Sequence, residues 1–261
     1  AESGKKWGNN ELEAFNITIE DAPIPAFFET QNLPPSRFAD SAIWNNEREP
    51  PKDTGISELE SGLYFYMKFA EEEAGLETGA FTWFLLRLFG FTSKYRRVRQ
   101  RPSMHFMMSG KRVNASADVT LVGIEDFLLV VQKDKLHQSS ENPEAQLIAA
   151  TIAAFYENRE RLRCVGRPAP TQQVLFGITM AGTAPIFYRV LVTEKLLRAL
   201  EHGPYPEEET VVLRFVPPVP TMNSYLTSGM RPLENRRIVF RCFERLEALI
   251  VSLHTAYYIH Y

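Results

Sequence analysis

The chain has few of the residues that build disulfide frameworks or zinc sites. Its 261 residues include two cysteines, Cys164 and Cys242, and five scattered histidines. Two isolated thiols supply neither a four-ligand zinc site nor the spacing of a secreted disulfide scaffold. Long apolar runs are also missing, since no stretch approaches the roughly 18 residues that a membrane span needs. We therefore expect an intracellular protein, cytoplasmic or nuclear, with reduced thiols and no membrane association.

An excess of charge of one sign is absent as well. The formal net charge is −3, with 29 Lys and Arg residues against 32 Asp and Glu residues. This balance gives no global attraction for nucleic acid, so nucleic-acid binding would have to come from a local basic patch. The sequence contains neither an internal repeat nor a glycine-rich phosphate loop that ends in lysine. A hydrophobic content of 44% is ordinary for a globular protein and predicts a sizeable core.

Proline content and helix-start signals divide the chain into three segments. Residues 1–56 hold many prolines among short apolar pieces, which predicts an N-terminal arm wrapped on the core. Ser57 followed by Glu60 forms a capping-box pattern, and the helical periodicity behind it opens a core at 57–201. Residues 202–261 are predicted to form a C-terminal extension that packs on this core.

Apolar periodicity and turn residues predict an ordered series of elements. We expect one or two helices over 57–89, a strand over 101–110, a hairpin of 111–123 with 126–135, a helix from Asn142, two strands over 173–193, a helix over 194–201, a strand over 211–220 and a helix over 236–254. The three strands between 101 and 135 are expected to form an antiparallel meander.

The predicted hairpin carries charged residues at defined positions. Asp118 lies in its first strand, and Lys133 and Lys135 lie at the end of its second. Because side chains alternate along a strand, both lysines share a face with Val131, whereas Gln132 points to the opposite face. An acid and a lysine on neighbouring strands make this segment the most informative part of the sequence.

This order of elements, with an acid in the second strand and a lysine at the end of the third, resembles the core of the PD-(D/E)XK nuclease superfamily. The resemblance covers roughly residues 57–193. The segments LLVVQKDK and NPEAQLIAATIAAF are also similar to predicted nuclease-like proteins of mushroom-forming fungi. The resemblance implies an α/β fold with a restriction endonuclease-like core of helix, three strands, helix and strand, flanked by the N-terminal arm and a C-terminal helical extension.

The resemblance also implies a site and a reaction, the hydrolysis of a phosphodiester in DNA or RNA. Asp118 and Glu60 would hold Mg²⁺ or Mn²⁺, Lys135 would orient the attacking water, and Gln146 would steady the site. Lys133 stands where the family has its second acid. Two like charges about 4 Å apart cost on the order of 4 kcal/mol at an effective dielectric of about 20, so this ammonium would weaken cation binding.

Two interpretations therefore remain open. In the first, Asp134 turns inward on a bulged strand, or Glu60 and Gln132 help to complete a shifted ligand set, and the site works as a nuclease. In the second, the chain is a catalytically inactive nuclease-like scaffold that binds a protein or a nucleic acid through the same cleft. Lys133 is the residue that favours the second interpretation.

A run of cations lies between Lys94 and Arg101, just before the first predicted strand. We predict that Arg96, Arg97, Arg99 and Arg101 contact the phosphate backbone of a nucleic acid. The alternative is a solvated connector with no ligand. The aromatic surplus over 57–89 exceeds one helical stripe, so a second copy of the chain is a further candidate partner, in a homodimer.

Overall fold

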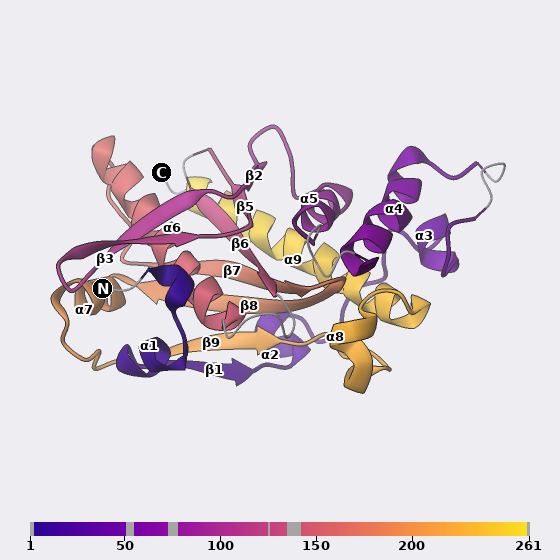
Figure 1. Cartoon of the computed structure of the whole chain (residues 1–261). Helices are drawn as coiled ribbons and strands as arrows, with labels where there is room; N and C mark the ends of the chain where they lie inside the picture. Colours follow the sequence, from indigo (N-terminus) through magenta and orange to yellow (C-terminus); the bar gives the residue numbers. More distant parts are fainter. Residues whose placement is uncertain (1–2, 51–54, 73–77, 125, 135–141, 260–261) are drawn as a thin grey trace.

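A computed structural model describes residues 3–50, 55–72, 78–124, 126–134 and 142–259 of the chain (Figure 1). Its main feature is a seven-stranded mixed sheet with the strand order β1 (Ile17–Asp21), β9 (Thr210–Phe215), β8 (Ala184–Thr193), β7 (Gln172–Ala181), β6 (Phe127–Asp134), β5 (Val119–Val122) and β2 (Arg97–Gln100). The pairs β1–β9 and β6–β7 are parallel, and the other neighbours are antiparallel. The predicted α/β class is confirmed.

Apolar side chains form one cluster on each face of this sheet. The first cluster joins the sheet to α6 (Pro143–Cys164), α7 (Glu194–His202), α1 (Asn9–Ala14) and the separate hairpin of β3 (Ser103–Met108) and β4 (Lys111–Ser116). The second joins it to α9 (Leu233–Ile259), α5 (Thr78–Leu88), α4 (Glu58–Glu72) and α2 (Ile24–Phe28). The short elements are η1 (Gly4–Lys6), α3 (Ala42–Asn45), η3 (Met222–Ser224) and α8 (Tyr225–Ser228).

Local signals set the position of α6, as predicted. The Asn142 side chain accepts a hydrogen bond from the Ala145 N–H at 3.0 Å, and Pro143 occupies the first helical position. Buried alanines along α6 let its backbone approach the sheet closely. Gly177 on β7 is part of this fit, because a Cβ at that position would lie 2.7 Å from Leu147 Cδ2. The crossover α6 therefore connects β6 to the parallel strand β7 in close contact with both.

The predicted three-strand meander is wrong in its pairing. Among the described strands, β3 and β4 pair with each other and with no other strand, around a turn at Ser109 and Gly110 that has positive φ at both residues. The predicted strand over 111–123 breaks at Ala117 and Asp118, so its second half becomes β5. Strand β2 takes the place beside β5 that the sequence had indicated for β3.

The sheet draws strands from all three predicted segments. β1, from the N-terminal arm, pairs in parallel with β9, from the C-terminal extension, with Ile17 opposite Thr210. β9 in turn pairs with β8. The two outer segments therefore extend the sheet directly, in addition to packing on it. None of the helices in the described part of the chain has the length and apolar character to cross a membrane.

Candidate functional site

Asp118 lies immediately before β5 and is held by three hydrogen bonds. Its N–H donates to Val131 O at 3.0 Å, and its carbonyl accepts from the Arg101 N–H at 2.9 Å. Its Oδ2 accepts from the Lys133 N–H at 2.8 Å. The prediction that positions 118 and 133 lie close together is thus confirmed. The contact joins the Asp118 carboxylate to the main chain of β6.

The alternation predicted for β6 is confirmed by what its side chains contact. Val131 is buried in the apolar cluster that includes α9, whereas Gln132 reaches α6 on the other face. Lys133 follows one residue later and is half-buried. Lys135, the predicted water-orienting residue, lies outside the described residues.

Gln146, a predicted site residue, does reach this end of β6. Gln132 Nε2 donates to Gln146 Oε1 at 3.3 Å, which links β6 to the first turns of α6. Gln146 is 6% exposed, and its own Nε2 has no hydrogen-bond partner among the described residues. Gln132 Oε1 is likewise buried with no partner in that part of the chain. Within it, the amide pair therefore keeps one unused donor and one unused acceptor close to Lys133.

Glu60 has a structural role that does not bring it to Asp118. Its Oε2 accepts from the Ser57 hydroxyl at 2.7 Å and from the Ser57 N–H at 3.1 Å, and its Oε1 accepts from the Ala42 N–H at 2.8 Å. The hydrogen bond from the Ser57 side chain lowers the pKa of Glu60. These contacts are the predicted capping box, which ties the start of α4 to α3. Figure 1 shows α4 at the end of the molecule opposite the β3–β4 hairpin. The expectation that Glu60 is a metal ligand is therefore not supported.

The described oxygen donors around Asp118 do not by themselves match a magnesium or manganese site. Such ions take about six oxygen ligands, usually including one or two carboxylates. Within the described ranges, no group of three His, Cys, Asp or Glu side chains could hold a metal ion. Asp118 contributes one carboxylate, one oxygen of which already accepts the Lys133 N–H. Glu71, near the other end of α4, is paired with Arg231 at 2.9 Å.

The predicted basic run divides into one arginine that is largely buried in an ion pair and three that are exposed. Arg96 Nη2 lies 3.0 Å from Glu247 Oε1 on α9, and this side chain is 11% exposed. The prediction that Arg96 contacts nucleic acid is therefore not supported, because the ion pair occupies its guanidinium. Arg97 and Arg99 are exposed on β2, the last strand at its end of the sheet, and Arg101 is exposed just after it.

A cavity of about 730 Å³ opens beside Asp118. Its lining comes from the N-terminal turn, from the link between β2 and β3, and from β4 and the segment that follows it. Lys5, Arg101 and Asp118 supply its charged groups, and Ser3, Ser103 and Ser116 supply hydroxyls. Charges of both signs thus lie around one polar cavity that is open to solvent.

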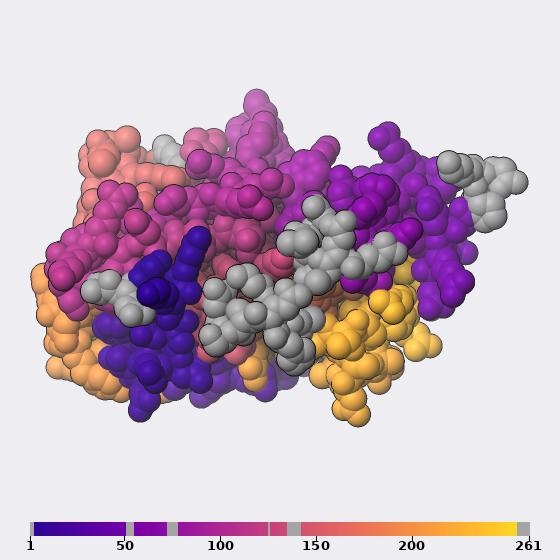
Figure 2. Space-filling model, in the orientation of Figure 1, coloured from indigo at the N-terminus to yellow at the C-terminus, as the bar shows by residue number. Residues whose placement is uncertain are grey.

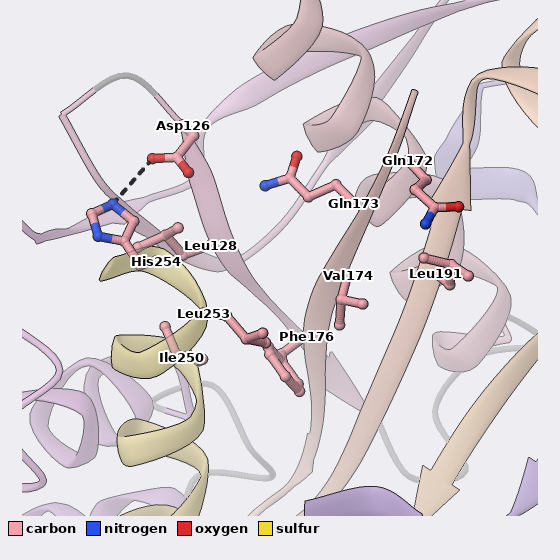
Figure 3. Close-up of a pocket in the computed structure, with 10 residues that line it drawn as sticks. All are labelled: Asp126, Leu128, Gln172, Gln173, Val174, Phe176, Leu191, Ile250, Leu253 and His254. Carbon is pink, nitrogen blue, oxygen red and sulfur yellow. Dashed lines mark ion pairs between the residues drawn. The ribbon is translucent and has the colours of Figure 1, made fainter. Parts of the chain in front are cut away.

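A second cavity, of about 270 Å³, lies on the α9 face of the sheet. Figure 3 shows Asp126 facing His254 at one end and mainly apolar side chains, such as Phe176 and Leu253, along the rest. The Asp126 Oδ1 and His254 Nε2 atoms are 3.5 Å apart. Gly123 gives this pair its space, because a Cβ there would lie 2.3 Å from Asp126 Oδ1. The pair fastens α9 to the β5–β6 turn.

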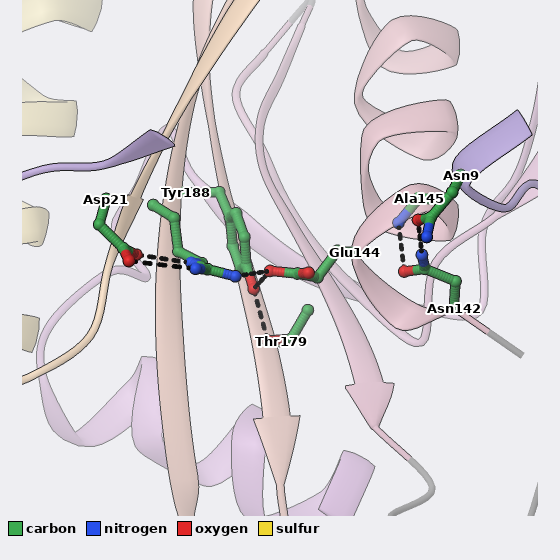
Figure 4. Close-up of polar contacts among 8 residues, drawn as sticks. Asn9, Asp21, Asn142, Glu144, Ala145, Thr179 and Tyr188 are labelled. Atoms are coloured by element: carbon green, nitrogen blue, oxygen red, sulfur yellow. Dashed lines mark hydrogen bonds and ion pairs between the residues drawn. The ribbon is translucent and has the colours of Figure 1, made fainter. Parts of the chain in front are cut away.

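A network of polar side chains that no sequence signal had indicated lies beneath the start of α6 (Figure 4). Glu144 Oε1 accepts from the Tyr188 hydroxyl at 2.7 Å and pairs with Arg214 Nη1 at 3.1 Å. Arg214 also forms two hydrogen bonds with Asp21, and the Tyr188 hydroxyl lies 3.3 Å from Thr179 Oγ1. The network links α6 to four strands, β1, β7, β8 and β9.

Protonation in this network is fixed by burial and by the ion pairs. Burial, with the adjacent Glu144 carboxylate, raises the pKa of the Tyr188 hydroxyl, which therefore remains a donor. The hydrogen bond with Asp21 raises the pKa of the Arg214 guanidinium, and the same bond lowers the pKa of Asp21. Each charged group has an opposite partner, so the arrangement is that of a structural clamp.

Comparison of the chain with protein-family models and with curated proteins gives no match, so the function has to be inferred from the geometry of these sites.

Proposed function

We propose that this chain is a nuclease-like nucleic-acid-binding protein of the PD-(D/E)XK type, in which Lys133 impairs metal-dependent phosphodiester hydrolysis. The strand arrangement supports this proposal. β2, β5 and β6 are consecutive antiparallel neighbours, and the crossover α6 leads from β6 to the parallel strand β7. This is the order of three strands, helix and strand expected for a restriction endonuclease-like core, with the β3–β4 hairpin as an insertion and α4–α5 as the preceding helices.

The contact between the Asp118 carboxylate and the Lys133 N–H is the observation on which the proposal rests. Through this contact the main chain of residue 133 meets the acid, and the resemblance expects a second carboxylate at position 133. A lysine there brings a positive charge in place of a ligand, a change of about two charge units. We therefore expect weak affinity for divalent cations and little or no cleavage.

The exposed arginines support nucleic acid as the ligand. Arg97 and Arg99 lie two residues apart on an edge strand, so their Cα atoms are about 7 Å apart along it. Neither they nor Arg101 form an ion pair with a described residue. Such a row suits sequence-independent contacts to backbone phosphates, which depend strongly on salt.

The test measures binding and cleavage separately. Fluorescence anisotropy with labelled single- and double-stranded DNA and RNA should show binding that weakens with salt. Three phosphate contacts on a single strand predict a slope of about −2 for log K against log salt concentration. The absence of binding to all four polymers at low salt would refute the proposal.

Cleavage in Mg²⁺ or Mn²⁺ is compared between the wild type, Lys133→Glu and Lys133→Gln. Only Lys133→Glu restores a carboxylate, whereas Lys133→Gln removes the charge and adds no anionic ligand. We expect cation binding by calorimetry, and cleavage, to appear or increase in Lys133→Glu alone. Efficient cleavage by the wild type would instead establish an active nuclease. Unchanged cation binding in Lys133→Glu would contradict the assignment of position 133.

A further inference from the structure

Two cationic side chains that have no partner in the described part of the chain line the cavity beside Asp118. Lys5 and Arg101 both line it, and both side chains are exposed. No ion pair or hydrogen bond of either side chain with a described residue is found. Two cationic side chains that line one cavity with a single carboxylate leave a local positive potential, which favours an anionic ligand.

Lys5 is held at the cavity by buried neighbours on both sides. Gly4 is buried, and a Cβ on it would lie 3.0 Å from Ala115 Cβ and 3.3 Å from Ala149 Cβ, so the turn sits directly on β4 and α6. Trp7 is 1% exposed and packs edge-on against Phe106 of β3 at 5.7 Å between ring centroids. Figure 2 shows this N-terminal segment, in indigo, seated against the magenta region of the hairpin.

Arg101 is held there by an unusual backbone conformation. Its φ is +46°, in the left-handed region that residues other than glycine rarely adopt. The hydrogen bond from its N–H to Asp118 O fixes this conformation at the junction of β2 and β3. Backbone conformations of this kind recur at ligand sites, where the surrounding structure holds them in place.

We propose that this cavity binds a backbone phosphate of a nucleic acid, with Lys5 and Arg101 as its cationic contacts. The inference rests on the proposed function and identifies where one phosphodiester binds. Two cations against the single Asp118 carboxylate leave a net charge of +1, which matches the single negative charge of a phosphodiester. The hydroxyls of Ser103 and Ser116 supply neutral donors to its oxygens. The bound phosphate lies next to Asp118 and continues the line of Arg97 and Arg99.

Three variants, Lys5→Ala, Arg101→Ala and the double variant of these two, are compared with the control variant Lys6→Ala. Lys6 is an exposed cation on the same turn that is not among the residues lining the cavity, so it is a matched control for lost charge. By anisotropy, we expect each cavity variant to weaken nucleic-acid binding about fivefold, the loss from one charge contact in water, and to flatten the salt slope by about 1. Lys6→Ala should change the affinity less than about twofold.

Inorganic pyrophosphate, titrated by calorimetry, is the second probe and requires no nucleic acid. It should bind the wild type and Lys6→Ala, and the double variant should lose this binding. If the double variant matches Lys6→Ala with both probes, the cavity is not the phosphate site, even where the wild type still binds nucleic acid. If the wild type binds pyrophosphate in the cavity but no nucleic acid, the phosphate site stands and the proposed function fails. Thermal unfolding of all variants checks that the fold is unchanged.

Discussion

The Glu144 network and the Asp118 cavity contain similar side chains but differ in how those side chains are paired. Around Glu144, the carboxylates and the guanidinium pair with one another, and the Tyr188 hydroxyl donates to Glu144. Around Asp118, the one carboxylate accepts a main-chain N–H, and the nearby cations Lys5 and Arg101 face solvent without described partners. Charged groups that satisfy one another hold elements together, whereas charged groups without internal partners are available to a ligand.

Substitution of Glu144 should cause the largest loss of stability. Glu144→Ala removes the acceptor of the buried Tyr188 hydroxyl and one of the two partners of Arg214. We expect the free energy of unfolding to fall by about 1–3 kcal/mol, as when the acceptor of a buried hydroxyl is removed. Urea titration measures this change.

Glu160→Ala is the matched control for that experiment. Glu160 lies on the same helix, and its ion pair with Arg163 is exposed on both sides. Removing such a pair should change stability by less than about 0.5 kcal/mol. Equal losses for the two variants would mean that the Glu144 network contributes no more than a surface pair, and the contrast with the Asp118 cavity would disappear.

The second largest predicted effect on stability is a difference between Arg96 and Arg99, two arginines of the basic run. Arg96→Ala breaks a largely buried ion pair with Glu247 and should lower the free energy of unfolding by about 1–2 kcal/mol. Arg99→Ala removes an exposed cation, so it should leave stability within about 0.5 kcal/mol and weaken nucleic-acid binding instead. Urea unfolding and anisotropy on both variants separate the two effects. A stability loss in Arg99→Ala equal to that in Arg96→Ala would contradict the division into paired and available arginines.

Elements with strong local signals could be predicted from the sequence. The cap of α6 requires Asn142 and Pro143 alone, and the β7–β8 turn joins residues adjacent in the chain, with Ala181 opposite Ala184. Pairing between distant segments could not be predicted, because nothing local distinguishes the partner of β1 from any other strand edge. The β3–β4 hairpin was misassigned for a similar reason, since its apolar alternation suits either sheet.

The candidate site shows the same limit. The proximity of Asp118 to position 133 could be predicted because Asp118 directly precedes β5, the antiparallel neighbour of β6, and the turn between the two strands sets their register. The structure does not support the roles predicted for Glu60 and Arg96. The capping box, which the sequence does indicate, occupies the Glu60 carboxylate, whereas no local signal identifies Glu247 as the partner of Arg96. The Glu144 network was missed because its members are contributed by five elements, which only the completed fold brings together.

The smallest predicted effect concerns how acid weakens the Glu144 network. The hydrogen bond from Arg214 lowers the pKa of Asp21, so folding favours the ionised carboxylate. This contribution is fully present above the unfolded pKa of about 3.9 and is lost as the pH falls through the lower, folded value. Because Asp21 is largely exposed, the contribution should stay below about 1 kcal/mol.

Asp21→Asn should therefore be less stable than the wild type at pH 7, and the difference should shrink in acid. Glu20→Gln is the control at pH 7: Glu20 lies next to Asp21 on β1 without a described ion-pair partner, so its removal should cost less stability in urea titrations than Asp21→Asn. A constant difference between Asp21→Asn and the wild type in urea titrations from pH 7 to about 3 would show that the Arg214 bond does not depend on the Asp21 charge.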